Sequence, residues 1–260
     1  MSRAAQMDLI ESLPYSLSKA GPADIAGVGN YYIEILARGG SGHSAITVYL
    51  LDSHAYSPNE RKYRGYDWIK QNQIDWFRNT AHGLKKKHKE YTHHHMDVAF
   101  IHIPLPEYTW PNLTMVGAWK EPSTAPAYNS RFYDALVEEG ISMVSCGQYV
   151  AYSLSTSPPT YVACSLRLTP PASDHVNEYC ALSHTLDEKP ALWMCHAGAA
   201  GFGGYAGYGG FHRKIRIFDF DMNEARVRTW KRVEYGPDVD KKIEELLIVD
   251  AGRVVAPMEE

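Results

Sequence analysis

The stretch YYIEILARGGSGHSAITVYLLDSH, residues 31–54, decides the fold class of this 260-residue chain. Two runs rich in β-branched and aromatic residues, 31–36 and 45–53, flank a glycine-rich segment, a pattern that predicts a β-hairpin. The second run closes on an Asp-Ser-His triplet, so polar side chains directly follow a buried strand. Loops that leave strand ends are where open α/β sheets build their sites.

The rest of the chain continues with helices and then with strands. Helices are predicted from apolar spacing over 67–88 and 130–139. Further strands are predicted over 97–104, 141–147, 191–198, 213–220 and 225–232. Strand and helix alternate first and strands cluster later, which predicts a layered α/β sandwich around packed sheets.

We assign residues 1–260 to one partial domain, in which the acidic residues 238–260 form a C-terminal tail on the surface. The opening residues, MSRAAQMDLIESLPYS, lack the apolar core of a signal peptide. They instead predict a helix already under way, as in the middle of a domain.

Composition limits the partners. The net charge of −4 gives no reason to expect nucleic acid or an acidic membrane surface. The basic run 85–89 closes a predicted helix, where cations meet the negative end of the helix dipole. No apolar run is long enough to span a bilayer.

Cysteine usage favours a reducing compartment, and hence the cytoplasm. Cys146, Cys164, Cys180 and Cys195 show neither C-x-x-C pairing nor the density of a disulfide framework. We therefore expect them to be small buried hydrophobic residues. A single N-x-T sequon at Asn112 argues only weakly for secretion.

Several predicted strand ends carry His or Asp. Asp52 and His54 follow one strand, His102 lies near the end of another, and Asp174-His175 follow a third. One such histidine is usually structural. Several that converge favour a metal, because neutral imidazole suits Zn, Fe, Ni and Cu.

Three motifs carry a family resemblance: AFIHIPLPEY (99–108), CG…DHVNEYC (146–180) and GAAGFGGYAGYGGFHRKIRIF (198–218). Together they resemble the C-terminal half of a calcineurin-like metallophosphoesterase, nearest to a fungal and plant branch similar to purple acid phosphatases. The likeness covers the chain outside 148–173. It implies a layered α/β/β/α sandwich, here with its N-terminal part missing. It also implies two divalent cations (Mn, Fe or Zn) that hydrolyse a small phosphate ester or a phosphoprotein.

The family's metal ligands come from D-x-H, G-D and G-N-H-D/E motifs, a lone histidine and a G-H-x-H motif. By resemblance the lone histidine is His102 and the last histidine of G-H-x-H is His175, whereas Gln148 stands where its first histidine should be. The G-D and G-N-H-D/E motifs are absent from the sequence, and the resemblance matches no segment to the family's D-x-H motif, since it places Asp52-Ser53-His54 downstream of that motif. Two imidazoles cannot hold a dinuclear site, since catalytic zinc alone usually takes three protein ligands.

We therefore predict that this chain alone neither binds the metals stably nor hydrolyses phosphate esters. The residues expected at the rim of the site are Asp52, His54, Asp174, Asn177 and His212. The alternative is a non-catalytic relic or binding module on the same scaffold.

Residues 148–173 are interpreted as an insert foreign to the family. Codons for Gln148-Tyr149-Val150 can contain a fungal splice donor, and a codon for Ser173 can contain an acceptor. Removing the intervening bases keeps the frame and restores Cys-Gly-His-Asp-His-Val-Asn, so a translated intron is one hypothesis. The other is a genuine lineage-specific loop, which would displace metal ligands by many ångströms. Its proline pairs disfavour helix or central strand.

One interpretation of the glycine-rich run that begins at residue 198 is a phosphate-binding loop. It lacks the Gly-Lys-Ser/Thr ending of a P-loop, and its glycines alternate with aromatic residues. We interpret it as a close-packed loop near the mouth of the site, with a rim role for Tyr205, Tyr208 or His212 as the lesser alternative.

Overall fold

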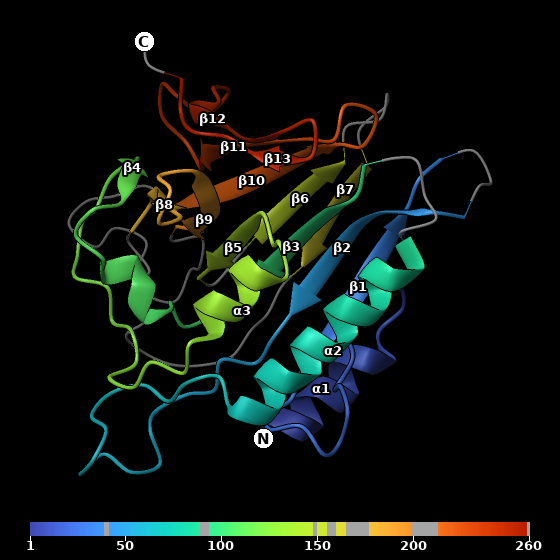
Figure 1. The fold of residues 1–260 in the computed structure, drawn as a ribbon, viewed down its shortest axis with the longest axis vertical. Helices are drawn as coiled ribbons and strands as arrows, with labels where there is room; N and C mark the ends of the chain where they lie inside the picture. Colours follow the sequence, from blue (N-terminus) through green and yellow to red (C-terminus); the bar gives the residue numbers. More distant parts are fainter. Residues whose placement is uncertain are drawn as a thin grey trace.

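The chain forms two stacked β-sheets with helices against the first sheet, in a computed structural model (Figure 1). The described residues are 1–38, 42–88, 94–147, 150–154, 160–164, 177–198 and 213–258. Their helices are α1 (Arg3–Ser12), α2 (Gln71–His88), the short 3-10 helix η1 (Pro106–Thr109) and α3 (Phe132–Glu138).

The first sheet has seven strands in the order β1-β2-β3-β5-β9-β8-β4. In chain order these are β1 (Tyr31–Leu36), β2 (Ser44–Leu50), β3 (Met96–Phe100), β4 (Thr114–Val116), β5 (Met143–Cys146), β8 (Cys180–His184) and β9 (Pro190–His196). β2, β3, β5 and β9 run parallel, and the outer pairs are antiparallel. Every residue of β2 is buried, as expected for a strand with both faces covered.

The second sheet has six strands in the order β13-β12-β11-β10-β6-β7. In chain order these are β6 (Val150–Leu154), β7 (Thr160–Cys164), β10 (Lys214–Asp221), β11 (Arg226–Val233), β12 (Ile243–Asp250) and β13 (Arg253–Val254). The alternating burial of β10 sends Phe218 and Phe220 toward the first sheet. The ring of Phe218 lies 5.9 Å from that of Phe100, so aromatic contacts join the sheets.

Two apolar layers hold this arrangement together. One lies between the helices and the first sheet, where Phe77 of α2 meets Phe132 of α3 at 5.3 Å between ring centroids. The other lies between the two sheets. The predicted α/β sandwich of packed sheets is therefore found. The expected second helical layer is not, because the helices of the described residues all lie beside the first sheet (Figure 1).

The ends of several elements differ from the prediction. The strand expected over 97–104 ends at Phe100. The N–H groups of His102 and Ile103 donate to Oγ of Ser53, at 3.1 and 2.8 Å, so a side-chain acceptor replaces the strand ladder before Pro104 is reached.

Two segments expected to lie outside the sheets belong to the second sheet. The predicted surface tail 238–260 contains β12 and β13, and Leu246, Ile248 and Val249 of β12 are buried. Within the insert, β6 pairs in parallel with β10 and in antiparallel with β7. The insert's proline pairs lie outside the described residues.

The cysteine prediction is wrong at two positions. Cys180 of β8 and Cys195 of β9 lie directly opposite one another and form a disulfide. Cys146 is buried, as predicted, with its Sγ 3.4 Å from Nδ1 of His196. Cys180 and Cys195 are 15 residues apart in sequence, so only the register of the two strands brings them together.

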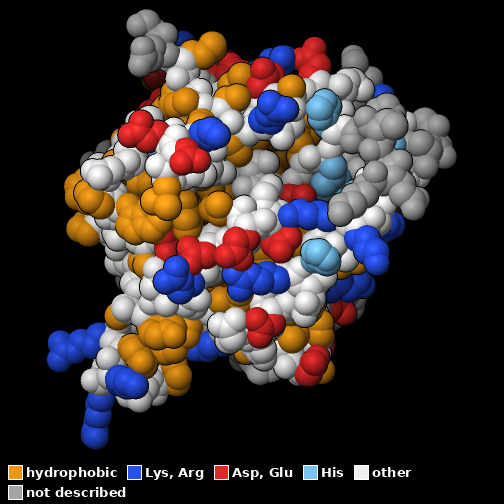
Figure 2. Space-filling view, in the orientation of Figure 1, with side chains coloured by type: hydrophobic (Ala, Val, Ile, Leu, Met, Phe, Trp, Pro, Cys, Tyr) orange, Lys and Arg blue, Asp and Glu red, His pale blue; other side chains and the backbone are white. Residues whose placement is uncertain are grey.

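The surface carries both signs of charge. Figure 2 shows acidic side chains lying beside Lys and Arg across one face, with histidines among them. Within the described residues, the helices are all too short or too polar to cross a bilayer.

Candidate functional site

The carboxyl ends of the parallel strands lie along one edge of the first sheet, which we call the carboxyl edge. Asp52 follows β2, His102 follows β3, Gly147 follows β5 and His196 ends β9. Backbone hydrogen bonds keep these ends in register, since the N–H of Gly147 donates to the carbonyl of His102 at 3.2 Å. Asp52 and His102, predicted at strand ends, therefore both lie along this edge, and their role in a site stays a prediction.

Asp52 is buried and fully engaged within the protein. Its Oδ2 accepts the N–H of Val28 at 2.7 Å and forms an ion pair with Arg3 of α1. Its Oδ1 accepts the N–H of His54 at 2.8 Å. A Cβ at Gly27, which has φ of +90°, would lie 2.6 Å from Oδ2, so the loop can close over the carboxylate only with glycine there.

His54 is held by Gln73 rather than directed into open space. Its Nε2 lies 2.7 Å from Oε1 of Gln73, and burial lowers its pKa. Gln73 is fully buried and donates to Oδ1 of Asn30 and to the carbonyl of Asp52, each at 2.8 Å. We call Arg3, Asn30, Asp52, His54 and Gln73 the edge network.

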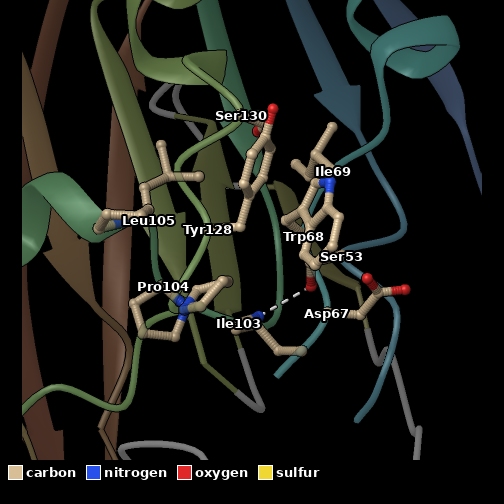
Figure 3. Close-up of a pocket in the computed structure, with 11 residues that line it drawn as sticks. Ser53, Asp67, Trp68, Ile69, Ile103, Pro104, Leu105, Tyr128 and Ser130 are labelled. Atoms are coloured by element: carbon tan, nitrogen blue, oxygen red, sulfur yellow. Dashed lines mark hydrogen bonds between the residues drawn. The ribbon is translucent and has the colours of Figure 1, made fainter. Parts of the chain in front are cut away.

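His102, the predicted metal ligand, is half-buried at the end of β3. Burial lowers its pKa, although a hydrogen bond with the backbone of Gly147 acts in the opposite direction. Ser53 ties the two neighbouring loops together, because its Oγ accepts the N–H groups of His102 and Ile103, and Figure 3 shows the bond from Ile103.

A small hollow lies beside Ser53. Figure 3 shows Trp68 and Tyr128 on its wall, with 4.6 Å between their ring centroids, and Pro104 and Ile103 below them. Its volume of about 10 Å³ holds roughly one water molecule, so it does not admit a phosphate ester.

Asn177, predicted at the rim, is fully buried and connects two loops. Its Oδ1 accepts the N–H groups of Lys120 and Glu121, at 2.8 and 3.1 Å. Its Nδ2 donates to the carbonyl of Glu121 at 2.9 Å. The carboxamide thus fixes the loop after β4 onto the start of β8.

The remaining predicted site residues lie outside the described residues: Gln148, Asp174, His175, Tyr205, Tyr208 and His212. The predicted convergence of His102 with His175 therefore stays a prediction.

The described residues do not by themselves fit a metal. No three of their His, Cys, Asp or Glu side chains are placed to share an ion. The oxygens of Asp52 are occupied by N–H donors and Arg3, and Nε2 of His54 by Gln73. Any metal at this edge would need additional donors.

A buried charged cluster that was not predicted from the sequence lies at the other end of the edge. Glu178 forms ion pairs with Lys120, Lys214 and Lys231, and Arg216 donates to the carbonyl of Glu178. We call these five residues the lysine corner. Burial acts to raise the pKa of Glu178, but the three ammonium groups lower it to about 2.

A sequence signal for this corner does exist. Lys214, Arg216, Phe218 and Phe220 alternate along β10, so two cations share a strand face with two buried aromatic residues. Arg216 also pairs across the ladder with Lys231. Cationic side chains at the inward-facing positions of a strand indicate a buried anionic partner.

His196 ends β9 beside this corner and is fully buried. Its ring packs against Tyr108 and Tyr179, with centroids 4.9 and 4.6 Å away. Burial lowers its pKa to about 3, and the nearby charge of Arg216 adds to the shift. The imidazole is therefore neutral and belongs to the core.

Comparison with known proteins places the chain among phosphatase-like sequences. No protein-family model matches it. It is 35% identical over 249 residues to Phosphatase DCR2 of Saccharomyces cerevisiae, covering 91% of this chain and 38% of that protein. The similarity to this phosphatase suggests a metallophosphoesterase-like family.

Two plant relatives carry different names. The chain is 30% identical over 258 residues to Probable inactive purple acid phosphatase 14 of Arabidopsis thaliana, covering 90% of the chain and 56% of the relative. It is 29% identical to Probable inactive purple acid phosphatase 29 of the same plant, covering 90% and 57%. The chain thus spans between 38% and 57% of the length of these relatives.

Proposed function

We propose that this chain is part of a metallophosphoesterase that hydrolyses small phosphate esters or phosphoproteins with two divalent cations, Mn, Fe or Zn. His102 and His175 are two of the ligands, and the other donors come from outside these 260 residues. The supporting observation is the position of His102, whose carbonyl accepts the N–H of Gly147, the residue that would open the G-H-x-H motif. The similarity to Phosphatase DCR2 points to the same chemistry.

The 260 residues alone are inactive in this proposal. A dinuclear site needs bridging carboxylates, and Asp52, a buried carboxylate shortly after the parallel strand β2, already forms an ion pair with Arg3. Asp52, His54, Asp174, Asn177 and His212 are proposed to support or border the site rather than to bind both cations.

For residues 148–173 we keep two proposals. In the first they are a translated intron, and splicing replaces Gln148 by the missing histidine. In the second they are a genuine loop, which is favoured by the pairing of β6 with β10. A transcript read across the segment decides between them, because the spliced message encodes Cys-Gly-His-Asp-His.

The alternative function is a non-catalytic binding module. It is favoured by the word "inactive" in the names of two relatives and by the ion pair that occupies Asp52. Genomic DNA upstream that encodes D-x-H, G-D and G-N-H-D motifs in frame would argue for the catalytic proposal.

The first test compares the 260-residue chain with the spliced, upstream-extended gene product. Both are assayed with p-nitrophenyl phosphate after loading with Mn, Fe or Zn, and bound metal is counted by mass spectrometry. We expect turnover in the extended product only. Metal-dependent turnover by the 260-residue chain would refute its proposed inactivity.

In the extended product, His102→Ala should lower kcat/KM by at least roughly 100-fold and reduce bound metal. Replacing a residue that only hydrogen-bonds to a metal ligand costs up to roughly 100-fold, and loss of the ligand itself should cost more. His82→Ala, on the exposed side of α2, is the matched control. An unchanged metal content in His102→Ala would remove His102 from the site.

A further inference from the structure

We propose that Asn112 carries an N-linked glycan whose first sugar packs on the ring of Trp110. This inference is independent of the proposed phosphatase function. Asn112-Leu113-Thr114 is the single N-x-S/T sequon of the sequence, with no proline at its middle or following position.

The sequon is presented in a form that accepts a bulky group. Asn112 lies in a turn and Thr114 begins β4, which stands at the edge of its sheet and, among the described strands, pairs with β8 alone (Figure 1). Both side chains are exposed, whereas Leu113 between them packs against the core. The inward anchor at Leu113 thus directs its two neighbours toward solvent.

An aromatic platform lies two residues before the acceptor. The ring of Trp110 meets that of Tyr133 edge-on at 4.9 Å, yet 43% of Trp110 remains exposed. Trp110 and Asn112 line one hollow of about 640 Å³ together with His184, Thr185 and Glu188. Such a surface fits a sugar, whose C–H face can pack on an aromatic ring while its hydroxyl groups bond to polar neighbours.

The disulfide gives independent support for the compartment. Disulfides form and persist in oxidising compartments such as the endoplasmic reticulum, where N-glycans are also attached. Cys180 lies on β8, the strand that pairs with β4, and faces Cys195. The disulfide and the sequon therefore point to the same compartment, contrary to the cytoplasm favoured by cysteine spacing.

The transfer is chemically complete with a lipid-linked oligosaccharide diphosphate as donor. A bond forms between Nδ2 of Asn112 and C1 of the first N-acetylglucosamine. The bond from that C1 to the diphosphate breaks, the lipid diphosphate leaves, and the amide nitrogen loses a proton.

The first test uses the protein recovered from the cells that produce it. Peptide N-glycosidase F in ¹⁸O-water converts a glycosylated asparagine to labelled aspartate. We expect the label at Asn112, and alkylation before reduction should leave Cys180 and Cys195 unmodified. An unlabelled, unmodified Asn112 peptide overturns the proposal.

Matched variants made in the same cells test the sequon. Thr114→Ser keeps the hydroxyl and should retain the glycan, whereas Thr114→Val keeps the shape and should lose it. Retention of the glycan in Thr114→Val would show that this sequon is not the site.

The contact with Trp110 has its own test. We expect enzymatic removal of the glycan to lower Tm in the wild type and in Trp110→Phe, and to leave Tm unchanged in Trp110→Ala. Trp119→Ala, at another exposed tryptophan, is the control. An equal loss of Tm in Trp110→Ala would refute packing of the sugar on Trp110.

Discussion

The edge network and the lysine corner lie at opposite ends of the same carboxyl edge, and they are built differently. The edge network contains one ion pair, between Arg3 and Asp52, and otherwise neutral hydrogen bonds around Gln73. The lysine corner gathers three ammonium groups and a guanidinium around Glu178. Polar residues at strand ends can thus stabilise the fold in two ways, mainly through neutral hydrogen bonds or through a cluster of charges.

The difference teaches where charge matters for the fold. Arg3 keeps 32% of its side chain exposed, so the side chain can turn its guanidinium toward water. Lys231 keeps only 3% and lies between Glu178 and Glu244. We therefore expect the lysine corner to depend on its carboxylate more than the edge network does.

The largest expected effect is that of Glu178→Gln. It leaves four buried or half-buried cations around a neutral amide, and breaking such a cluster costs about 4 kcal/mol in the free energy of unfolding. Urea denaturation measures the change. Glu60→Gln, in an exposed turn, is the control and should be neutral.

One further variant sharpens this prediction. Adding Lys231→Met removes a buried cation, so the double variant should regain part of the lost stability. If Glu178→Gln lowers the free energy of unfolding by less than about 1 kcal/mol, the lysines are solvated. The lysine corner would then not depend on its carboxylate more than the edge network does.

The same variant should change the response to acid. The pKa of Glu178 is lowered from 4.5 to about 2, so the unfolded chain binds more protons in that window. Its contribution is complete above pH 4.5 and is lost as pH falls toward 2. The stability gap between wild type and Glu178→Gln should shrink over this range, and a constant gap would contradict the ion-pair explanation.

A smaller effect is expected for Asp52→Asn, about 2 kcal/mol. One oxygen of Asp52 is replaced by an NH₂ group that must face Arg3 or an N–H donor, because both oxygens accept such donors. The free energy of unfolding is measured again by urea. Asp8→Asn, exposed on the same helix as Arg3, is the matched control.

A double-mutant cycle with Arg3→Met tests the origin of this loss. If the ion pair is responsible, the effect of Asp52→Asn should be smaller in the Arg3→Met background. An equal effect in both backgrounds would assign it to the loop N–H groups instead.

Local patterns predicted much of the fold. The hairpin of β1 and β2, helix α2 and the pair β10–β11 follow from periodicity, and Asp52 and His102 follow strands that the sequence predicted, while their role in a site stays a prediction. β12 was missed because its glutamates suggested a surface tail, although Leu246 and Ile248 alternate as in a half-buried strand.

Features that depend on pairing between distant segments were not predictable. The disulfide requires the register that sets Cys180 opposite Cys195. The lysine corner joins the loop after β4, the start of β8 and two strands of the second sheet. Asn177 was expected at the rim from the resemblance around His175, and its hydrogen bonds to a loop 56 and 57 residues away could not be read from the sequence.

The smallest effect is expected for His54→Asn, about 1 kcal/mol. His54 has φ of 67°, a left-handed conformation that asparagine tolerates, so the variant loses mainly the hydrogen bond to Gln73. His54→Val should cost more, because a branched side chain is strained at positive φ.

Unfolding is compared with and without Zn or Mn. A structural histidine leaves the metal response of wild type and His54→Asn alike. Metal-dependent stabilisation that disappears in His54→Asn would make this residue a ligand and would turn the edge network from a closed hydrogen-bonded cluster into part of a metal site.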